Sequence, residues 1–287
     1  MGIFTSKSET PPPSPLLQQP WRKTTWGQME EQMQFLQFVQ PGSDAVSNIR
    51  IMLYGPVGAG KSSFINSVNS ILQGRMAGEA LADSVASSVS FTKKYTTYKM
   101  KKGRRGQFYP FIFNDIMGLE GQVGVCKKDI KLALKGHMRE GYKFNPASPL
   151  SKDDAGFNPC PTPDDIVHVL VCVVPSPNTS QIPGDTMTQM RDIRLFASDR
   201  GIPQIAVITK IDEACPEVER DIRNVYKSKL LKKNMEDFSA RLGIPMNCIF
   251  PVKNYHEETS LDDDVSLLIL TALKQITDFG KDYIERM

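Results

Sequence analysis

Short apolar runs alternate with stretches of helical periodicity along most of the chain. Four runs have the continuous or alternating pattern of buried strands, at 49–54, 166–174, 204–208 and 247–252. Apolar residues recur at helical spacing over 63–72, 127–139, 185–198, 218–226, 228–242 and 262–287. Strands that alternate with helices predict an α/β fold with a mostly parallel sheet, in which ligands bind at the carboxyl ends of the strands.

One part of the sheet is predicted to be antiparallel. Residues 93–100 alternate between polar and apolar side chains, and 108–113 form a second apolar run. The short segment between them contains two glycines, which is typical of a hairpin. The pattern therefore predicts a sheet of about six strands, with one antiparallel hairpin strand and with helices on both faces.

The pattern also divides the chain into three regions. Residues 1–20 are rich in proline and serine, which predicts a disordered leader. Residues 21–44 carry apolar side chains at helical spacing, which predicts an N-terminal helix that packs on the domain. The domain itself is expected to occupy 45–287, with a long surface loop over 142–163.

Composition narrows the class of protein only slightly. The chain has 287 residues, a formal net charge of +3 and five cysteines. The small charge argues against nucleic acid as a partner, and the scattered cysteines favour reduced thiols in a cytoplasmic protein. No apolar run is long enough for a transmembrane segment, and no secretory signal peptide is expected. The start MGIFTS fits an N-myristoylation pattern, so acylation of Gly2 stays open.

The segment after the first strand carries the strongest motif. GPVGAGKS at 55–62 matches G-x-x-x-x-G-K-S/T between a strand and a helix, which predicts a P-loop and makes the fold Ras-like. Such a loop aims backbone N–H groups and the start of a helix at phosphates. Lys61 would reach the β- and γ-phosphates as a catalytic group, and the Ser62 hydroxyl would bind Mg²⁺. The expected nucleotide-binding residues of this loop are Gly55, Gly58, Ala59, Gly60, Lys61, Ser62 and Ser63.

Further groups are predicted near the γ-phosphate. Asp115 and Gly118 form a D-x-x-G motif after the second hairpin strand, where the carboxylate would hold Mg²⁺ and the Gly118 N–H would meet the γ-phosphate. Thr92, just before the first hairpin strand, is the candidate for a threonine that contacts the metal and assists catalysis. Leu119 takes the place of the glutamine that orients water in many GTPases, which predicts slow intrinsic hydrolysis.

A third motif predicts the base. TKID at 209–212 matches N/T-K-x-D, in which Thr209 and Lys210 precede the carboxylate of Asp212. This carboxylate can accept hydrogen bonds from both N1–H and N2–H₂ of guanine, whereas adenine offers an acceptor at N1 and would be rejected. The Lys210 stem can lie along one face of the base. A second base loop is expected at Val252-Lys253-Asn254, after the last strand, with Val252 and Lys253 as its nucleotide-binding residues.

With these motifs the chain resembles the interferon-induced protein 44 family. The resemblance runs from about residue 21 to the C-terminus and rests on GPVGAGKSSFINSVNS (55–70), SFTKKYTTY (90–98), NDIMGLEG (114–121), LKGHMREGYKFNP (134–146), TKIDEAC (209–215) and PVKNYHEE (251–258). It implies a cytoplasmic protein of the interferon and antiviral response whose domain binds GTP or GDP with Mg²⁺. Some members carry an extra N-terminal domain that is not expected in this chain, so the role of that domain is not implied.

The expected function is that of a cytosolic GTP-binding protein, a switch or scaffold in an interferon-linked immune response. Whether it is an enzyme stays open, because hydrolysis could be slow or could need a second copy or a protein partner on the switch face. Two alternatives remain. One is a scaffold that binds nucleotide without hydrolysing it, and the other is a P-loop ATPase or nucleotide kinase, against which TKID argues.

Overall fold

The computed structural model describes residues 14–77, 94–103, 106–120 and 124–287, apart from two side chains, at 178 and 180. Gly2 and Thr92, for which acylation and a switch role are predicted, lie outside the described residues.

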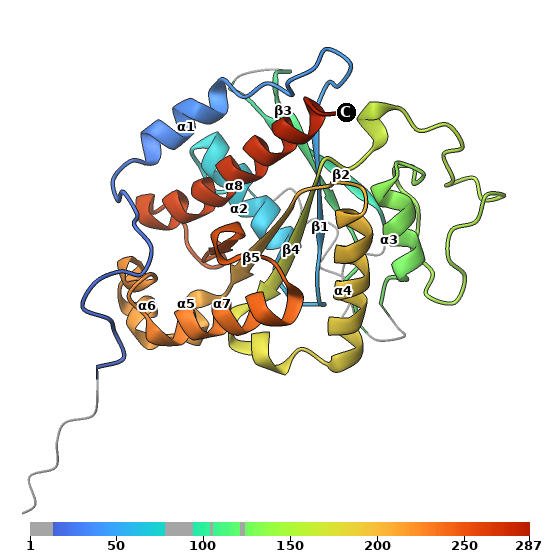
Figure 1. Cartoon of the computed structure of the whole chain (residues 1–287). Helices are drawn as coiled ribbons and strands as arrows, with labels where there is room; N and C mark the ends of the chain where they lie inside the picture. The colour runs from blue at the N-terminus through green and yellow to red at the C-terminus, as the bar shows by residue number, and fades with distance from the viewer. Residues whose placement is uncertain (1–13, 78–93, 104–105, 121–123) are drawn as a thin grey trace, which may run out of the picture.

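Six strands form one mixed sheet in the order β2–β3–β1–β4–β5–β6 (Figure 1). The strands are β1 Ile49–Tyr54, β2 Thr96–Lys101, β3 Phe108–Asp115, β4 Val169–Pro175, β5 Gln204–Thr209 and β6 Ile249–Pro251. β2 pairs antiparallel with β3, and the other four pairings are parallel. The predicted α/β fold, a mostly parallel sheet with one antiparallel hairpin strand, is confirmed.

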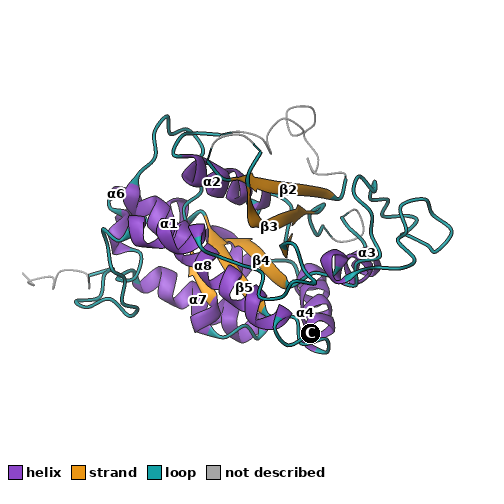
Figure 2. Ribbon diagram, turned by 90° about the horizontal axis from the view of Figure 1, so that it is seen from above, coloured by secondary structure: helices purple, strands orange, loops and turns teal. Residues whose placement is uncertain are grey.

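Helices cover both faces of this sheet (Figure 2). They are α1 Met29–Gln37, α2 Lys61–Gln73, α3 Lys127–Leu134, α4 Gly184–Ser198, α5 Ile211–Ala214, α6 Pro216–Arg220, α7 Lys229–Leu242 and α8 Asp263–Ile284. Side chains alternate between the faces of a strand. Ile51 and Leu53 of β1 therefore pack with α2 and α8, whereas Met52 and Tyr54 pack with α3 and α4.

Two predicted helices differ from the observed ones, and the backbone explains both differences. The helix expected over 127–139 ends at Leu134, because Gly136 takes the left-handed conformation at φ +79°. The helix expected over 218–226 is interrupted at Asp221, which is extended at φ −151°. The Asp221 side chain accepts a hydrogen bond from the Arg223 N–H at 3.0 Å and so caps a short turn instead of continuing the helix.

The N-terminal segment is less helical than its pattern predicts. The helix expected from residue 21 onward begins only at Met29. Before it, the Trp21 ring packs edge-on against the Tyr226 ring, with the ring centroids 5.2 Å apart. The Arg22 guanidinium donates a hydrogen bond to the Ile249 carbonyl at 2.7 Å. The Leu17 N–H donates to the carbonyl of residue 227 at 2.8 Å. These contacts hold residues 14–22 against the part of the domain that contains α7 and β6.

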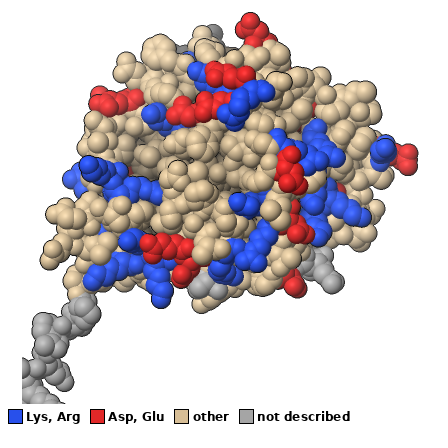
Figure 3. Space-filling view, in the orientation of Figure 1, with Lys and Arg blue, Asp and Glu red and all other residues tan. Residues whose placement is uncertain are grey.

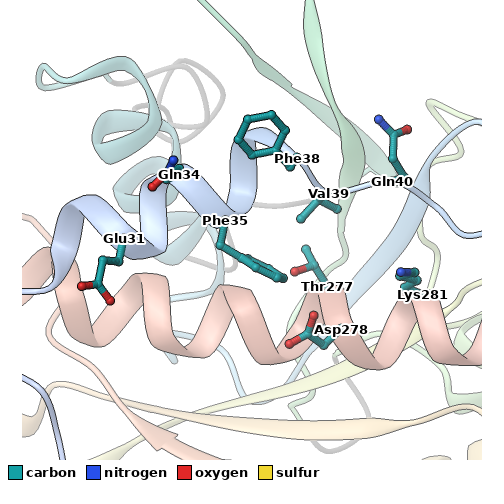
Figure 4. A pocket seen from close by; sticks show the side chains of 9 residues that line it. All are labelled: Glu31, Gln34, Phe35, Phe38, Val39, Gln40, Thr277, Asp278 and Lys281. Carbon is teal, nitrogen blue, oxygen red and sulfur yellow. The ribbon is translucent and has the colours of Figure 1, made fainter.

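Helix α1 lies along α8 (Figure 4). Leu36 is fully buried, and the Phe35 ring points toward Thr277 and Asp278 of α8. Phe38 points away from α8 and is 73% exposed. Between them the two helices leave a pocket of about 460 Å³.

The described surface has no single charged face in the view of Figure 3, where acidic and basic side chains are interspersed. In the described part of the chain, no helix combines the length and the apolar character that crossing a bilayer requires.

Candidate functional site

The P-loop connects β1 to α2, as predicted. Gly55 sits at φ +148°, and a Cβ added there would lie 2.0 Å from the Val173 carbonyl oxygen of the neighbouring strand. Gly60 sits at φ +86°, and its Cβ would lie 2.8 Å from the Asn254 amide nitrogen. Both positions therefore require glycine, the first because of the sheet and the second because of a contact with another loop.

Lys61 lies under this loop. Its side chain is buried, and the ammonium donates to the carbonyls of Gly55 at 3.3 Å and Pro56 at 3.1 Å. Burial lowers the pKa of Lys61, while the nearby Asp115 carboxylate opposes this shift. A buried basic side chain is therefore held against the phosphate-binding loop.

Ser62 and Asp115 meet at the carboxyl end of β3. The Ser62 hydroxyl, on the first turn of α2, donates to Asp115 Oδ2 at 2.5 Å, and Asp115 is buried. A hydroxyl and a carboxylate held side by side are oxygen ligands of the kind that Mg²⁺ prefers. Two of the three residues predicted to bind the metal, Ser62 and Asp115, are thus brought together, and their chemistry fits the ion.

The D-x-x-G segment pairs with the P-loop. The Leu119 N–H donates to the Gly55 carbonyl at 3.0 Å, and the Val57 N–H donates to the Leu119 carbonyl at 3.4 Å. A Cβ on Gly118 would lie 2.6 Å from Val57 Cγ2, so the two segments are in close contact. The Leu119 side chain is only 2% exposed and packs in the core that contains α3 and α4. Position 119 therefore directs its side chain into the protein interior, which the motif alone does not reveal.

Thr209 ties the base motif to the P-loop. Its hydroxyl donates to the Ala59 carbonyl at 2.7 Å and also lies 3.3 Å from the Val174 carbonyl. The next residue, Lys210, is left-handed at φ +57° and is the one non-glycine residue with a positive φ in the part of the chain that the structure describes. Such a conformation costs a non-glycine residue about 1–2 kcal/mol and is typical of functional sites.

A pocket of about 300 Å³ lies between the base motif and the P-loop. Its lining includes Gly60, Ser63, Lys210, Asp212, Lys253 and Asn254. The Lys210 ammonium lies 3.2 Å from Glu213, and the Lys253 ammonium lies 3.8 Å from the Asp212 carboxylate. The stems of Lys210 and Lys253 and the Asp212 carboxylate, together with further acidic residues, thus border a cavity that adjoins the phosphate loop.

The second base loop follows β6. Val252, directly after the strand, is fully buried, and its N–H donates to the Ile208 carbonyl at 2.8 Å. Lys253 and Asn254 line the pocket. The Asn254 amide donates to the Gly60 carbonyl at 3.1 Å, and the next N–H, of Tyr255, donates to the Ser67 hydroxyl at 2.9 Å.

Asn254 and Tyr255 were not among the predicted site residues. Their contacts cross nearly 200 positions of sequence, which no local pattern reveals. The available signal was their place at the carboxyl end of a strand, directly after Lys253.

Two human proteins match most of the chain. Interferon-induced protein 44-like from Homo sapiens is 34% identical over 248 residues, which are 86% of this chain and 54% of that protein. Interferon-induced protein 44 from Homo sapiens is 31% identical over 251 residues, which are 87% of this chain and 56% of that protein. The chain is homologous to the interferon-induced protein 44 family. It spans about half the length of these curated relatives.

Other comparisons concern the fold. The crystal structure of Toc33 from Arabidopsis thaliana in complex with GDP and Mg²⁺ is similar to the chain at a TM-score of 0.49 and 14% identity, over 90% of this chain and 93% of that chain. No family model matches the chain. The strand order and the P-loop of the chain itself define its fold class.

The segments that carry the resemblance to the interferon-induced protein 44 family have different surroundings. Residues 55–70, 209–215 and 251–258 contribute to the P-loop and the adjoining pocket. The segment 134–146 begins at the last residue of α3 and contacts the long loop that leads to β4. Within it, the His137 ring stacks on Phe157 at 5.0 Å, and its Nδ1 lies 2.8 Å from the Asn158 carbonyl.

Proposed function

We propose that the chain binds the guanine nucleotides GTP and GDP together with Mg²⁺. The hydrogen bond from Thr209 to the Ala59 carbonyl carries this proposal, because it fixes the base motif against the phosphate loop. The Asn254 bond to the Gly60 carbonyl supports it from the second base loop. One ligand with a base at one end and phosphates at the other fits this arrangement.

The phosphates belong in the loop from Gly55 to Ser63. Its backbone N–H groups and the start of α2 favour anions, and Lys61 supplies a cation beneath the loop. Ser62 and Asp115 are the metal ligands of the proposal, and bound Mg²⁺ would neutralise phosphate charge. Gly118 and Thr92 remain candidates for contacts to the γ-phosphate.

The base belongs in the pocket beside Asp212. A carboxylate with two acceptor oxygens matches the two donors on the guanine edge. In this proposal the stems of Lys210 and Lys253, which both line the pocket, cover the two faces of a flat ring. Adenine would leave an acceptor facing the carboxylate, and the proposal therefore excludes ATP as the preferred ligand.

The homology supports a proposal for the biological role. The relatives are named as interferon-induced proteins, and we propose that this chain is a cytoplasmic switch or scaffold in an interferon-linked, antiviral response. Its nucleotide domain is proposed to occupy 45–287, with residues 21–44 packed on it. A protein partner or a second copy would bind the switch face, the surface around Thr92 and the segment from Asp115 to Gly118.

Hydrolysis is proposed to be slow or dependent on assembly. The motif provides no glutamine after Gly118, and the buried Leu119 side chain points into the core. The same observation favours a second candidate, a scaffold that binds guanine nucleotide and does not hydrolyse it. In both cases the binding chemistry is the same.

Isothermal titration with GTP, GDP and ATP in the presence of Mg²⁺ tests the binding proposal. We expect saturable binding of GTP and GDP and much weaker binding of ATP. Equal affinity for ATP and GTP would contradict the assignment of Asp212 as the base-reading group.

Phosphate release measured over a range of protein concentrations separates the two candidates. Turnover per molecule that rises with concentration identifies assembly-dependent hydrolysis. Tight GTP binding with no phosphate release at any concentration identifies the scaffold.

A further inference from the structure

Glu258 is held rigidly in the loop that follows β6. Its Oε2 accepts the backbone N–H groups of His256 at 2.8 Å and Glu257 at 3.2 Å. Its Oε1 lies 2.8 Å from the Lys253 ammonium. Despite a desolvation cost that acts in the opposite direction, these backbone hydrogen bonds and the Lys253 ion pair lower the pKa of Glu258 to about 2, so the carboxylate is ionised at neutral pH.

Lys253 lies between two carboxylates. Its ammonium is 2.8 Å from Glu258 and 3.8 Å from Asp212 Oδ2. All three side chains are partly buried, with exposures of 30% for Lys253, 31% for Glu258 and 23% for Asp212. Since charge attraction weakens with distance, the nearer Glu258 is the main partner of the ammonium.

Without Glu258, Asp212 would be the one carboxylate left within 4 Å of the ammonium among the described residues. Lys253 has a flexible stem, and a shift of about 1 Å would bring its ammonium into a direct ion pair with Asp212. The ammonium would then occupy an acceptor oxygen that guanine recognition requires. The Lys253 side chain can therefore either cover one face of the base or block the Asp212 carboxylate that would recognise the base.

We infer that Glu258 is a positioning residue for guanine recognition, which draws the Lys253 ammonium away from Asp212 and leaves both Asp212 oxygens for the base. This inference rests on the proposed guanine-nucleotide site. It adds a residue outside the TKID motif to the specificity of that site. It also gives the PVKNYHEE segment a function, because Lys253 and Glu258 both lie within it.

Inosine triphosphate is the probe that isolates this effect. Its base keeps the N1–H of guanine and lacks the exocyclic N2 amino group, so it uses one Asp212 oxygen instead of two. We expect the wild-type chain to prefer GTP over ITP by about tenfold or more, the size of one hydrogen bond to a charged group. In Glu258→Gln, the Lys253 ammonium competes for Asp212, and the GTP to ITP ratio is expected to fall toward one.

The double variant Glu258→Gln, Lys253→Met removes the competing ammonium and keeps most of the stem. We expect it to recover the wild-type GTP to ITP ratio. Glu236→Gln is the matched control, since it removes a carboxylate from a surface pair with Lys232 on α7, and it should leave the ratio unchanged. Thermal unfolding of each variant, without nucleotide, reports whether the fold is retained.

The outcomes separate the inference from the function on which it rests. A wild-type chain that binds neither GTP nor ITP contradicts both. A wild-type chain that prefers GTP, with the same preference in Glu258→Gln, overturns the role of Glu258 alone. Failure of the Lys253→Met change to restore the ratio also overturns it, because the fall would then not come from the Lys253 ammonium. If Glu258→Gln does not fold, Glu258→Ala is used in its place, with the same expected fall in the ratio.

Discussion

Leu119 illustrates what one residue position contributes to a nucleotide site. The motif places it directly after Gly118, where a glutamine would orient water in many GTPases. The fold buries its side chain and uses its N–H and carbonyl to pair with the P-loop. The position therefore stabilises the contact between the two phosphate-side segments, and its side chain is buried in the core.

The substitution Leu119→Gln is expected to destabilise the chain without creating a catalytic group. Burying an unpaired amide in this core should cost roughly 2–4 kcal/mol, measured as the free energy of unfolding in urea. Leu119→Met keeps the volume and should cost less than about 1.5 kcal/mol. A Leu119→Gln protein that is as stable as wild type and hydrolyses GTP faster would show that the side chain reaches the site.

The residues of the site differ in how far sequence could predict them. Lys61 and Ser62 follow from spacing alone, because the P-loop motif fixes their place relative to the glycines. The predicted roles of Ser62 and Asp115 imply that the two side chains lie close together, and their oxygen atoms are 2.5 Å apart. The contact of Asn254 with Gly60 could not be predicted, because it forms only when two separate loops meet, and the role of Glu258 depends on where its loop places Lys253 beside Asp212.

Helix α8 is an element whose bounds the sequence predicted and whose packing it did not. Its apolar periodicity predicted a helix over 262–287, and the observed helix spans Asp263–Ile284. The pattern did not reveal that Gly280 is the point of closest approach to the sheet. A Cβ there would lie 2.3 Å from Ile49 Cγ2 and 2.9 Å from Val169 Cγ2. The helix can lie this close to β1 and β4 only because residue 280 has no side chain.

Gly280→Ala should therefore destabilise the protein, although alanine is the better helix former by about 1 kcal/mol. We expect a net loss of roughly 1–3 kcal/mol in the free energy of unfolding, because the fully buried Ile49 must move. Gly184→Ala in α4 is the control, since its Cβ would meet no atom within 4 Å. A Gly280→Ala protein more stable than wild type would contradict the close contact between α8 and the sheet.

At the scale of the whole molecule, the strand order brings the motifs together at one edge of the sheet. β1 lies at the centre of the sheet between β3 and β4, with β5 and β6 beyond β4. The carboxyl ends of β1, β3, β5 and β6 carry the P-loop, Asp115, the TKID motif and the second base loop. Parallel strands present these ends at one edge, which is why motifs separated by about 200 residues form one site. This arrangement was predictable from the alternation of strands and helices, whereas the contact of Leu17 with residue 227, within the leader expected over 1–20, was not.

The most direct test of a guanine site is a change of base preference at Asp212. Xanthine keeps the N1–H donor of guanine and has a carbonyl acceptor where guanine has the N2 amino group. The amide of Asn at position 212 would match it with one acceptor and one donor. Isothermal titration of the wild type and of Asp212→Asn with GTP and XTP measures this preference. We expect the wild type to bind GTP in preference to XTP and the variant to reverse that order. A variant that binds GTP as tightly as the wild type would show that Asp212 does not read the base.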